Sequence, residues 1–235
     1  PALRSIKTVI ANSRATADCC AAIGIDPRVV RIVHPGTTLP AVAADADTAR
    51  SARLRLGIEG APLLLSVGRL TRRKGLLEFV ADVLPKLVAI KPEAKLLVVG
   101  SAPVDALNRN EASQATIERA AAARGVEGNL RFLGQVSDTE LDDLFSAADV
   151  HVFPVRVLPG DPEGFGMVAI EAAAHGVPTV AYAVGGVPDA VAEGVSGLLV
   201  APGDTAAFAA AVARVLEVPD WPDARAFAAG FEWAR

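Results

Sequence analysis

The sequence predicts an α/β fold built on a doubly wound, parallel β-sheet. Short apolar segments rich in β-branched residues alternate with helical patterns along the whole chain. These segments are apolar without interruption, which is typical of strands covered by helices on both faces. Six of them follow one another over about residues 60–215, each with a helix after it, and repeated units of this kind form parallel sheets.

Two strands are expected ahead of this region, at 7–12 and 28–34. The six strands within it are expected at 63–68, 94–100, 129–134, 149–154, 178–183 and 197–202. Helices are expected at 14–24, 48–57, 75–90, 111–124, 138–147, 165–175, 187–193 and 204–217. Ser13 is suited to cap the first helix, and Ser137 with Glu140 forms the capping-box pattern. Residues 1–34 therefore resemble part of a neighbouring unit, which the segment 35–60 joins to the main sheet.

Composition narrows the function classes. The chain has 235 residues, is 51% hydrophobic and carries a formal net charge of −4, which disfavours a nucleic-acid surface. No apolar run approaches the ~18 residues of a membrane span, although peripheral membrane contact stays open. Cys19 and Cys20 are adjacent and poorly placed to bridge each other, which favours reduced thiols and a cytoplasmic location.

Familiar cofactor and metal motifs are missing. The three histidines have no cysteine or second histidine at ligand spacing, so a zinc site is not expected. The P-loop pattern, the G-x-S-x-G elbow and a G-x-G-x-x-G fingerprint after the first strand are also absent. Ligands of doubly wound sheets bind at the carboxyl ends of the strands, so the loops after the strands are the places to search.

The first such loop is "VGRLTRRKGL" (67–76), which carries four positive charges in six residues. Cations beside a helix N-terminus favour a bound anion, since free backbone N–H groups and the helix dipole add to their attraction. We expect Arg69 and Lys74, with Gly68, to bind a diphosphate. For Arg72 and Arg73, a solvated basic turn is an equally good interpretation.

The second loop is "PEGFGMVAIEAAAHG" (162–176), where an apolar helix carries one acid, Glu171, and another acid, Glu163, precedes it. A buried carboxylate needs hydrogen-bond donors. Glu171 lies ~7–8 Å along the helix axis from Gly166, a plausible reach from a phosphate to a ribose, whose two hydroxyls a carboxylate can bind. Glu163 precedes the helix and would then face the part of the ligand that lies beyond the phosphates. A structural Arg–Glu ion pair is the alternative for Glu171.

A third loop, "RFLGQVSDTEL" (131–141), gives a weaker signal. Backbone groups of Gly134, Gln135 and Val136 could hold a nucleotide base there.

Together these stretches resemble the C-terminal, donor-binding half of a retaining glycosyltransferase of the GT-B fold, glycosyltransferase family 4 (group 1). The resemblance rests on "SVGRLTRRKG", "RFLGQVSDTELDDLFSAADVHVFP", "PEGFGMVAIEAAAHGVPTVAYAVGGVPDAV" and "GVSGLLVAPGD", in the family's order over about 60–215. The pair Glu163 and Glu171 is its most specific mark. The fold so implied is Rossmann-like.

The resemblance implies transfer of a sugar from a UDP- or GDP-sugar, with retention, to an acceptor that is a sugar, a lipid or a small molecule. It implies that Arg69 and Lys74 stabilise the diphosphate, that Glu171 binds the ribose, and that Glu163 orients the sugar and stabilises an oxocarbenium ion. A nucleophilic role for Glu163 stays open. The substrate-binding backbone is expected at Gly164, Phe165, Gly166, Met167 and Val168, and no metal or other cofactor is expected.

The resemblance also implies a division of the chain. Residues 1–34 would be a remnant or edge of an N-terminal domain with its linker, 35–218 the donor-binding domain, and 219–235 the start of a truncated C-terminal helix. An N-terminal domain would be needed as a partner, and the chain alone would be inactive. The connector "HPGTTL" (34–39) departs from the family, which often has a glycine turn followed by an acid. Half of a nucleotide-sugar epimerase and a non-catalytic nucleotide-sugar-binding module are the alternatives.

Overall fold

The computed structural model describes residues 7–40, 46–101, 113–218, 221 and 223–233. Its main sheet contains the parallel strands β3 (Leu63–Val67), β4 (Lys95–Val99), β5 (Leu130–Gly134), β6 (Val150–Phe153), β7 (Thr179–Tyr182) and β8 (Gly197–Val200). Their order in space is β5-β4-β3-β6-β7-β8. The chain thus moves outward from β3 to one edge, returns to β6 beside β3, and moves to the other edge. The predicted doubly wound sheet is confirmed.

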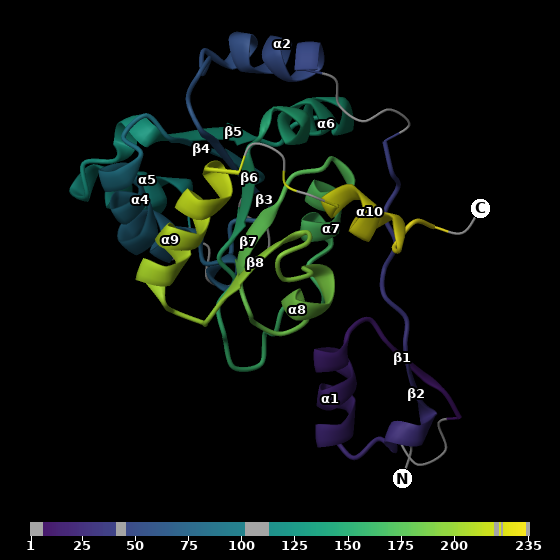
Figure 1. Ribbon diagram of the computed structural model, residues 1–235. Helices are drawn as coiled ribbons and strands as arrows, with labels where there is room; N and C mark the ends of the chain where they lie inside the picture. The colour runs from purple at the N-terminus through teal and green to yellow at the C-terminus, as the bar shows by residue number, and fades with distance from the viewer. Residues whose placement is uncertain (1–6, 41–45, 102–112, 219–220, 222, 234–235) are drawn as a thin grey trace.

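Helices cover both faces of this sheet, which explains the uninterrupted apolar strands (Figure 1). One face packs against α4 (Leu84–Ile90), α5 (Gln114–Ala123) and α9 (Thr205–Leu216), through Leu64 and Leu96 among others. The opposite face packs against α2 (Ala46–Leu56), α6 (Asp138–Ala147) and α7 (Met167–Ala174), through Leu65 and Leu97. Neighbours in sequence therefore point to opposite cores, as alternation along a strand requires.

Most expected helices are present with small shifts in their ends, but the one expected over 75–90 is divided. It consists of α3 (Leu76–Glu78), a π-helical segment (Phe79–Val83) and α4. Pro85 has no amide hydrogen and so cannot continue an i→i−4 ladder, and a π-turn directly before it absorbs the irregularity. Short 3₁₀ helices occur at Pro27–Val29, Arg72–Lys74 and Glu127–Asn129, and the predicted capping box at Ser137 is present.

Residues 7–34 form a small unit with its own two-stranded sheet. The strands β1 (Val9–Ala11) and β2 (Val30–Ile32) are parallel, and α1 (Arg14–Ala22) connects them. This unit lies beside α8 (Val187–Ala190), at one end of the main sheet (Figure 1). Arg14 fixes it there, since its backbone N–H and its Nε both donate to the Asp189 carboxylate over 2.6 Å.

The end of the chain closes over the linker that leaves the small unit. Helix α10 (Ala224–Ala229) packs against α7, and Thr37 and Phe231 are joined by a backbone hydrogen bond of 2.8 Å. The ring of Trp233 covers Gly36 so closely that any side chain at this position would overlap it. The main sheet, the linker and the final helix are therefore packed together.

Candidate functional site

The candidate site lies where the strand order reverses. Because β3 and β6 are neighbours and the chain leaves them toward opposite edges, the loops after these two strands diverge and leave a crevice. A cavity of about 490 Å³ lies between the two loops. It is lined by Asn12, Pro35, Val67, Gly68, Arg69, Arg73, Lys74, Pro162, Glu163, Gly164, Phe165, Gly166, Met167, Val168 and Glu171.

The cationic loop after β3 is held by a close contact with the loop after β6. Arg72–Lys74 form one 3₁₀ turn, which Gly75 ends in the left-handed region at φ 69°. A Cβ at Gly75 would lie 1.9 Å from the backbone oxygen of Pro154, so only glycine fits. The backbone N–H of Arg156 donates to the carbonyl of Arg73 over 2.8 Å. The position of the cations is therefore set by the neighbouring loop.

Glu163 lies at the meeting point of the two loops, with only 9% of the residue exposed. The Lys74 ammonium donates to its Oε2 over 2.8 Å, and Arg73 Nη1 donates to the same oxygen. The other side of the Arg73 guanidinium pairs with Asp161, whose Oδ1 lies 3.1 Å from Nε. Two cations thus converge on one carboxylate oxygen.

Lys74 occupies a largely dehydrated position. Its ammonium lies 4.7 Å from the centre of the Phe153 ring, which the buried His151 supports on the other side by stacking. Burial lowers the pKa of Lys74, the Glu163 carboxylate opposes that shift, and the positive charges of Arg73 and Arg69 add to it. Burial and nearby Lys74 lower the pKa of His151 to about 3, so that ring stays neutral.

The N-terminus of α7 faces the same cavity. Gly166 precedes the helix with φ 102°, a conformation that favours glycine, and no side chain caps the helix. The helix thus begins at Met167 rather than at Phe165, and its first N–H groups are available to an anion. The phenyl ring of Phe165 packs against His34 and Phe231, which anchors this loop to the linker and to the segment after α10.

Glu171 stands one and a half turns further along α7, half-buried in the wall of the cavity. Within the described residues, its carboxylate has no hydrogen bond or ion pair. Burial raises the pKa of Glu171, and the nearby His175 and Lys74 only partly oppose this shift. No arginine among the described residues therefore pairs with Glu171, and Arg73, one of the two arginines of this cavity, pairs with Glu163 instead.

The structure brings together every predicted site residue except those of the third loop. Gly134, Gln135 and Val136 do not line the cavity. Gly134 is nevertheless connected to it: its carbonyl accepts from Gly100 over 2.7 Å, and Gly100 packs directly on the carbonyl of Gly68. Val136 lines a separate hollow between α2 and α6. A role for these three residues in binding a base stays a prediction.

Five residues of the cavity were not singled out as binding residues by the sequence, and two of them, Arg73 and Asn12, have polar side chains. Arg73 was indistinguishable from Arg72 in a run of charges, yet its side chain is 12% exposed while Arg72 is exposed. Asn12 comes from the small unit. Its Oδ1 accepts from the Thr16 hydroxyl over 2.6 Å, and its Nδ2 lies 3.0 Å from where a Cβ of Gly164 would be. Nothing in "IANS" signals that this asparagine reaches a loop 150 residues later.

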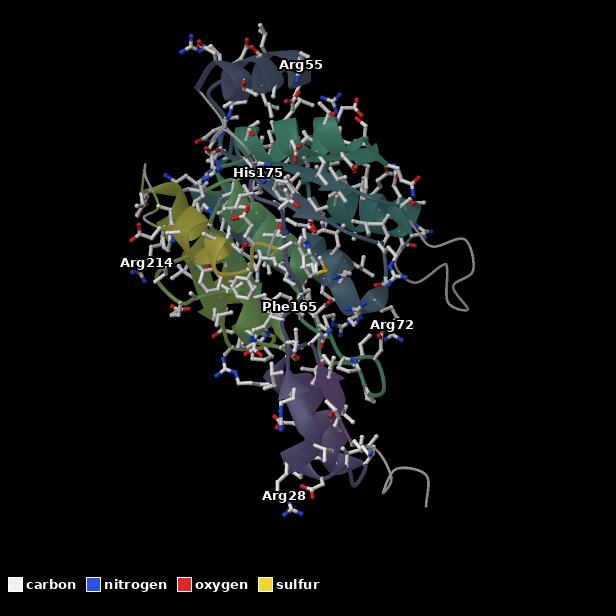
Figure 2. All side chains as sticks on the ribbon, turned by 90° about the vertical axis from the view of Figure 1, so that its right-hand side faces the viewer. Arg28, Arg55, Arg72, Phe165, His175 and Arg214 are labelled. Carbon is white, nitrogen blue, oxygen red and sulfur yellow. The ribbon has the colours of Figure 1, made fainter. Side chains whose placement is uncertain are left out.

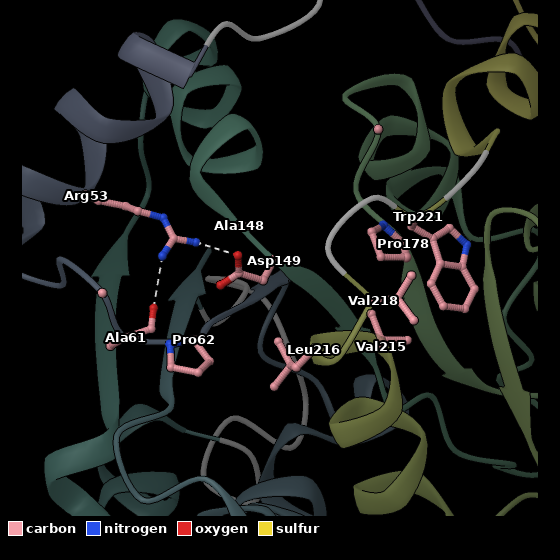
Figure 3. A pocket seen from close by; sticks show the side chains of 12 residues that line it. Arg53, Ala61, Pro62, Ala148, Asp149, Pro178, Val215, Leu216, Val218 and Trp221 are labelled. Atoms are coloured by element: carbon pink, nitrogen blue, oxygen red, sulfur yellow. Dashed lines mark hydrogen bonds and ion pairs between the residues drawn. The ribbon is translucent and has the colours of Figure 1, made fainter.

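A second hollow of about 360 Å³ lies at the amino-terminal edge of the sheet (Figure 3). Its one buried cation, Arg53, pairs with Asp149 over 2.7 Å and donates to the carbonyls of Ala61 and Ala147. Every group of that guanidinium is satisfied by the protein, so this hollow offers a ligand little to bind. Figure 2 shows Phe165 and Arg72 at the end of the main unit that faces the small unit, with Arg55 at the opposite end.

The described part of the chain offers neither a metal cluster nor a membrane-spanning helix. No group of three or more His, Cys, Asp or Glu side chains is arranged to hold a metal ion there. Among the helices of those same residues, none is both long enough and apolar enough to cross a membrane.

A doubly wound sheet with cations and a free helix N-terminus at its switch point defines an α/β protein of the anion-binding, Rossmann-like class. Comparison with known proteins identifies the family. The chain belongs to the family described as Glycosyl transferases group 1, whose model matches residues 50–229. The family resemblance of the motifs is thereby confirmed, and the main sheet is the C-terminal half of a GT-B fold.

The similarity to known proteins extends over most of this chain. The D-inositol 3-phosphate glycosyltransferase of Geodermatophilus obscurus is 39% identical over 218 residues, which are 90% of this chain and 46% of that protein. The enzyme of the same name from Mycobacterium leprae is 34% identical over 215 residues, 88% of this chain and 47% of its own. The chain thus spans about half the length of these relatives.

Two solved structures have the same fold. Sucrose-phosphate synthase from Thermosynechococcus elongatus is 31% identical with a TM-score of 0.78, and the match covers 98% of this chain and 56% of that one. Anabaena Alr3699/HepE in complex with UDP has a TM-score of 0.85 at 24% identity, over 98% of this chain and 61% of that one.

Proposed function

We propose that this chain is the donor-binding half of a retaining glycosyltransferase, which binds a nucleoside-diphosphate sugar and transfers the sugar to an acceptor. The observation that carries the proposal is the carboxylate of Glu171, which has no hydrogen bond or ion pair among the described residues and lies on a helix whose free N-terminus shares a cavity with Arg69 and Lys74. Five residues of helix separate Gly166 from Glu171, a rise of about 7.5 Å, which suits the step from a phosphate to a ribose.

The roles of the residues follow from this placement. Arg69, Lys74 and the first N–H groups of α7 bind the diphosphate and stabilise the charge that develops on it when the sugar leaves. Glu171 accepts hydrogen bonds from the ribose hydroxyls. Glu163 orients the sugar and stabilises the oxocarbenium ion, while the backbone of Gly164–Val168 lines the donor. The assignment of Gly134, Gln135 and Val136 to the base rests on their place after a strand in the sequence, since none of the three lines the cavity.

Metal ions have no part in this proposal, because Arg69 and Lys74 supply the positive charge beside the diphosphate. We therefore expect nucleotide binding to persist in EDTA. UDP is the first nucleotide to test and UDP-glucose the first donor, since Anabaena Alr3699/HepE was solved with each of them. The relatives are named D-inositol 3-phosphate glycosyltransferases, so a phosphorylated inositol is the first acceptor to test, in a protein that carries the other half of their length.

Nucleotide binding gives the direct test. We expect UDP or GDP to raise the melting temperature of the chain by roughly 5 to 10 °C at a hundred times its Kd, because such a ligand adds about 2.7 kcal/mol to a domain of this size. NAD should raise it by less than about 1 °C at the same concentration. Differential scanning fluorimetry with UDP, GDP, ADP and NAD would measure this, and stabilisation by NAD alone would contradict the proposal.

Replacing Glu163 distinguishes its contribution to binding the sugar from its contribution to binding the nucleotide. Glu163→Gln is expected to tighten UDP binding by about two- to fivefold, since Lys74 loses the carboxylate that holds it. The same change should remove any extra affinity of UDP-glucose over UDP, because the sugar loses its acceptor. Calorimetric titration with both ligands measures each part. A loss of UDP affinity in this variant would show that Glu163 contacts the nucleotide, contrary to the proposal.

A further inference from the structure

The arrangement around Glu163 raises a question that the sequence motifs do not answer. Lys74 is proposed to bind the diphosphate, yet its ammonium is held by Glu163 Oε2 over 2.8 Å. A phosphate that binds Lys74 therefore competes for the ammonium with a carboxylate that is almost buried. A buried carboxylate without a cation is strongly unfavourable, so binding the diphosphate would be opposed if Lys74 were its only partner.

Arg73 removes this obstacle. It already donates to the same oxygen of Glu163, so the carboxylate keeps a cationic partner when Lys74 turns away. The arginine is itself held in place, because its Nε pairs with Asp161 and its carbonyl accepts from the Arg156 N–H. Its aliphatic stem and guanidinium are both withdrawn from solvent, at 12% exposure of the side chain.

Geometry also argues against Arg73 as another phosphate ligand. Both of its contacts are to acids, Glu163 and Asp161, which offset its charge. Arg69 differs in this respect: it is exposed and has no ion pair within the described residues, so its charge is available to a phosphate. The cationic loop therefore contains one arginine, Arg73, whose charge is offset by acids, and another, Arg69, whose charge is available to a phosphate.

We propose that Arg73 is a positioning residue, which holds Glu163 in place and so releases Lys74 to bind the donor diphosphate. This inference rests on the proposed function, because it assumes a diphosphate beside Lys74. Arg73 stays with Glu163 in the free and in the bound chain, while Lys74 exchanges Glu163 for a phosphate oxygen. Both cations contact Oε2 of Glu163. The other oxygen, Oε1, therefore remains available to accept a hydrogen bond from the sugar.

A double-mutant cycle tests this role by calorimetric titration of the chain with UDP. Arg73→Met, which removes the charge and keeps the stem, is expected to weaken UDP binding about tenfold, the scale of one charged hydrogen bond. The double variant R73M/E163Q should bind UDP within about threefold of E163Q, because without the carboxylate there is nothing from which to release Lys74. Arg73→Lys should retain most of the affinity, and Arg72→Met is the matched control on the same turn.

Each result decides the question. Recovery in the double variant supports the inference, because a residue that merely maintains the fold of the loop would weaken binding whether or not Glu163 is charged. An R73M chain that binds UDP as tightly as the unsubstituted chain overturns it, as does an R73M/E163Q chain as weak as R73M. If the unsubstituted chain binds UDP, these outcomes leave the proposed function intact. If the unsubstituted chain binds neither UDP nor GDP, the proposed function fails and the inference fails with it.

Discussion

Replacing Glu171 with glutamine is expected to weaken UDP binding by about 10- to 100-fold and, in the same protein, to raise the melting temperature of the free chain. The loss follows from removing a charged acceptor of ribose hydrogen bonds, each worth about 1.5 to 3 kcal/mol. The gain in stability follows because Glu171 is a half-buried carboxylate with no hydrogen bond or ion pair in the described part of the chain, and glutamine carries no charge to dehydrate. Opposite effects on binding and stability are typical of functional residues.

The stability difference should depend on pH. Because burial raises the pKa of Glu171 above its unfolded value, the folded chain binds the proton more tightly than the unfolded chain. The unfavourable contribution of Glu171 is therefore largest at neutral pH, where the carboxylate is ionised in both states, and shrinks as the pH falls through the raised pKa. The melting temperatures of E171Q and of the unsubstituted chain should therefore converge as the pH is lowered from neutral toward the ordinary glutamate pKa of 4.5.

Glu217→Gln is the matched control, since it removes an exposed carboxylate at the end of α9, far from the cavity. It should change neither UDP affinity nor the pH dependence. An E171Q chain that binds UDP with unchanged affinity would show that the ribose is bound elsewhere. An E171Q chain that melts lower than the parent at pH 7 would show that Glu171 has a favourable partner in the free protein.

The sequence predicts features that depend on neighbouring residues better than features that depend on contacts between distant parts of the chain. The strands were recognisable because burial on both faces imposes an apolar run on each strand separately, and the cap at Ser137 is a contact within one turn. The π-turn ahead of Pro85 was missed, because the apolar pattern continues on both sides of this proline and a single helix was expected across it. The position of α7 beside the loop after β3 depends on the order of the strands, which the local patterns do not specify.

Within the site, the residues that the sequence could not assign are those defined by a partner far along the chain. Arg72 and Arg73 have the same side chain and adjacent positions, and only the direction of one 3₁₀ turn sends Arg73 to Glu163, 90 residues later. Asn12 enters the cavity because Arg14 and Asp189 fix the small unit beside α8. Such contacts are consequences of tertiary packing, and no local pattern encodes them.

Gly75→Ala is expected to destabilise the chain by about 3 kcal/mol or more and to abolish detectable UDP binding. Two effects add: an alanine in the left-handed region costs about 1 to 2 kcal/mol, and overpacking against a backbone atom costs about 1 to 3 kcal/mol. The second effect arises because the new Cβ would lie 1.9 Å from the carbonyl oxygen of Pro154. To relieve the overlap, the loops after β3 and β6 must separate, and with them Lys74 and Glu163.

Gly125→Ala separates these two effects, because Gly125 has φ 67°, almost the same as the 69° of Gly75, with no atom within 4 Å of its added Cβ. It should lose only the conformational part, about 1 to 2 kcal/mol, and bind UDP normally. Urea denaturation of both variants gives the stabilities, and titration with UDP gives the affinities. Equal destabilisation of the two variants would mean that the close approach to Pro154 does not hold the site together. A larger loss in G75A, accompanied by lost binding, would mean that one backbone contact between two loops sets the distance across which a donor is bound.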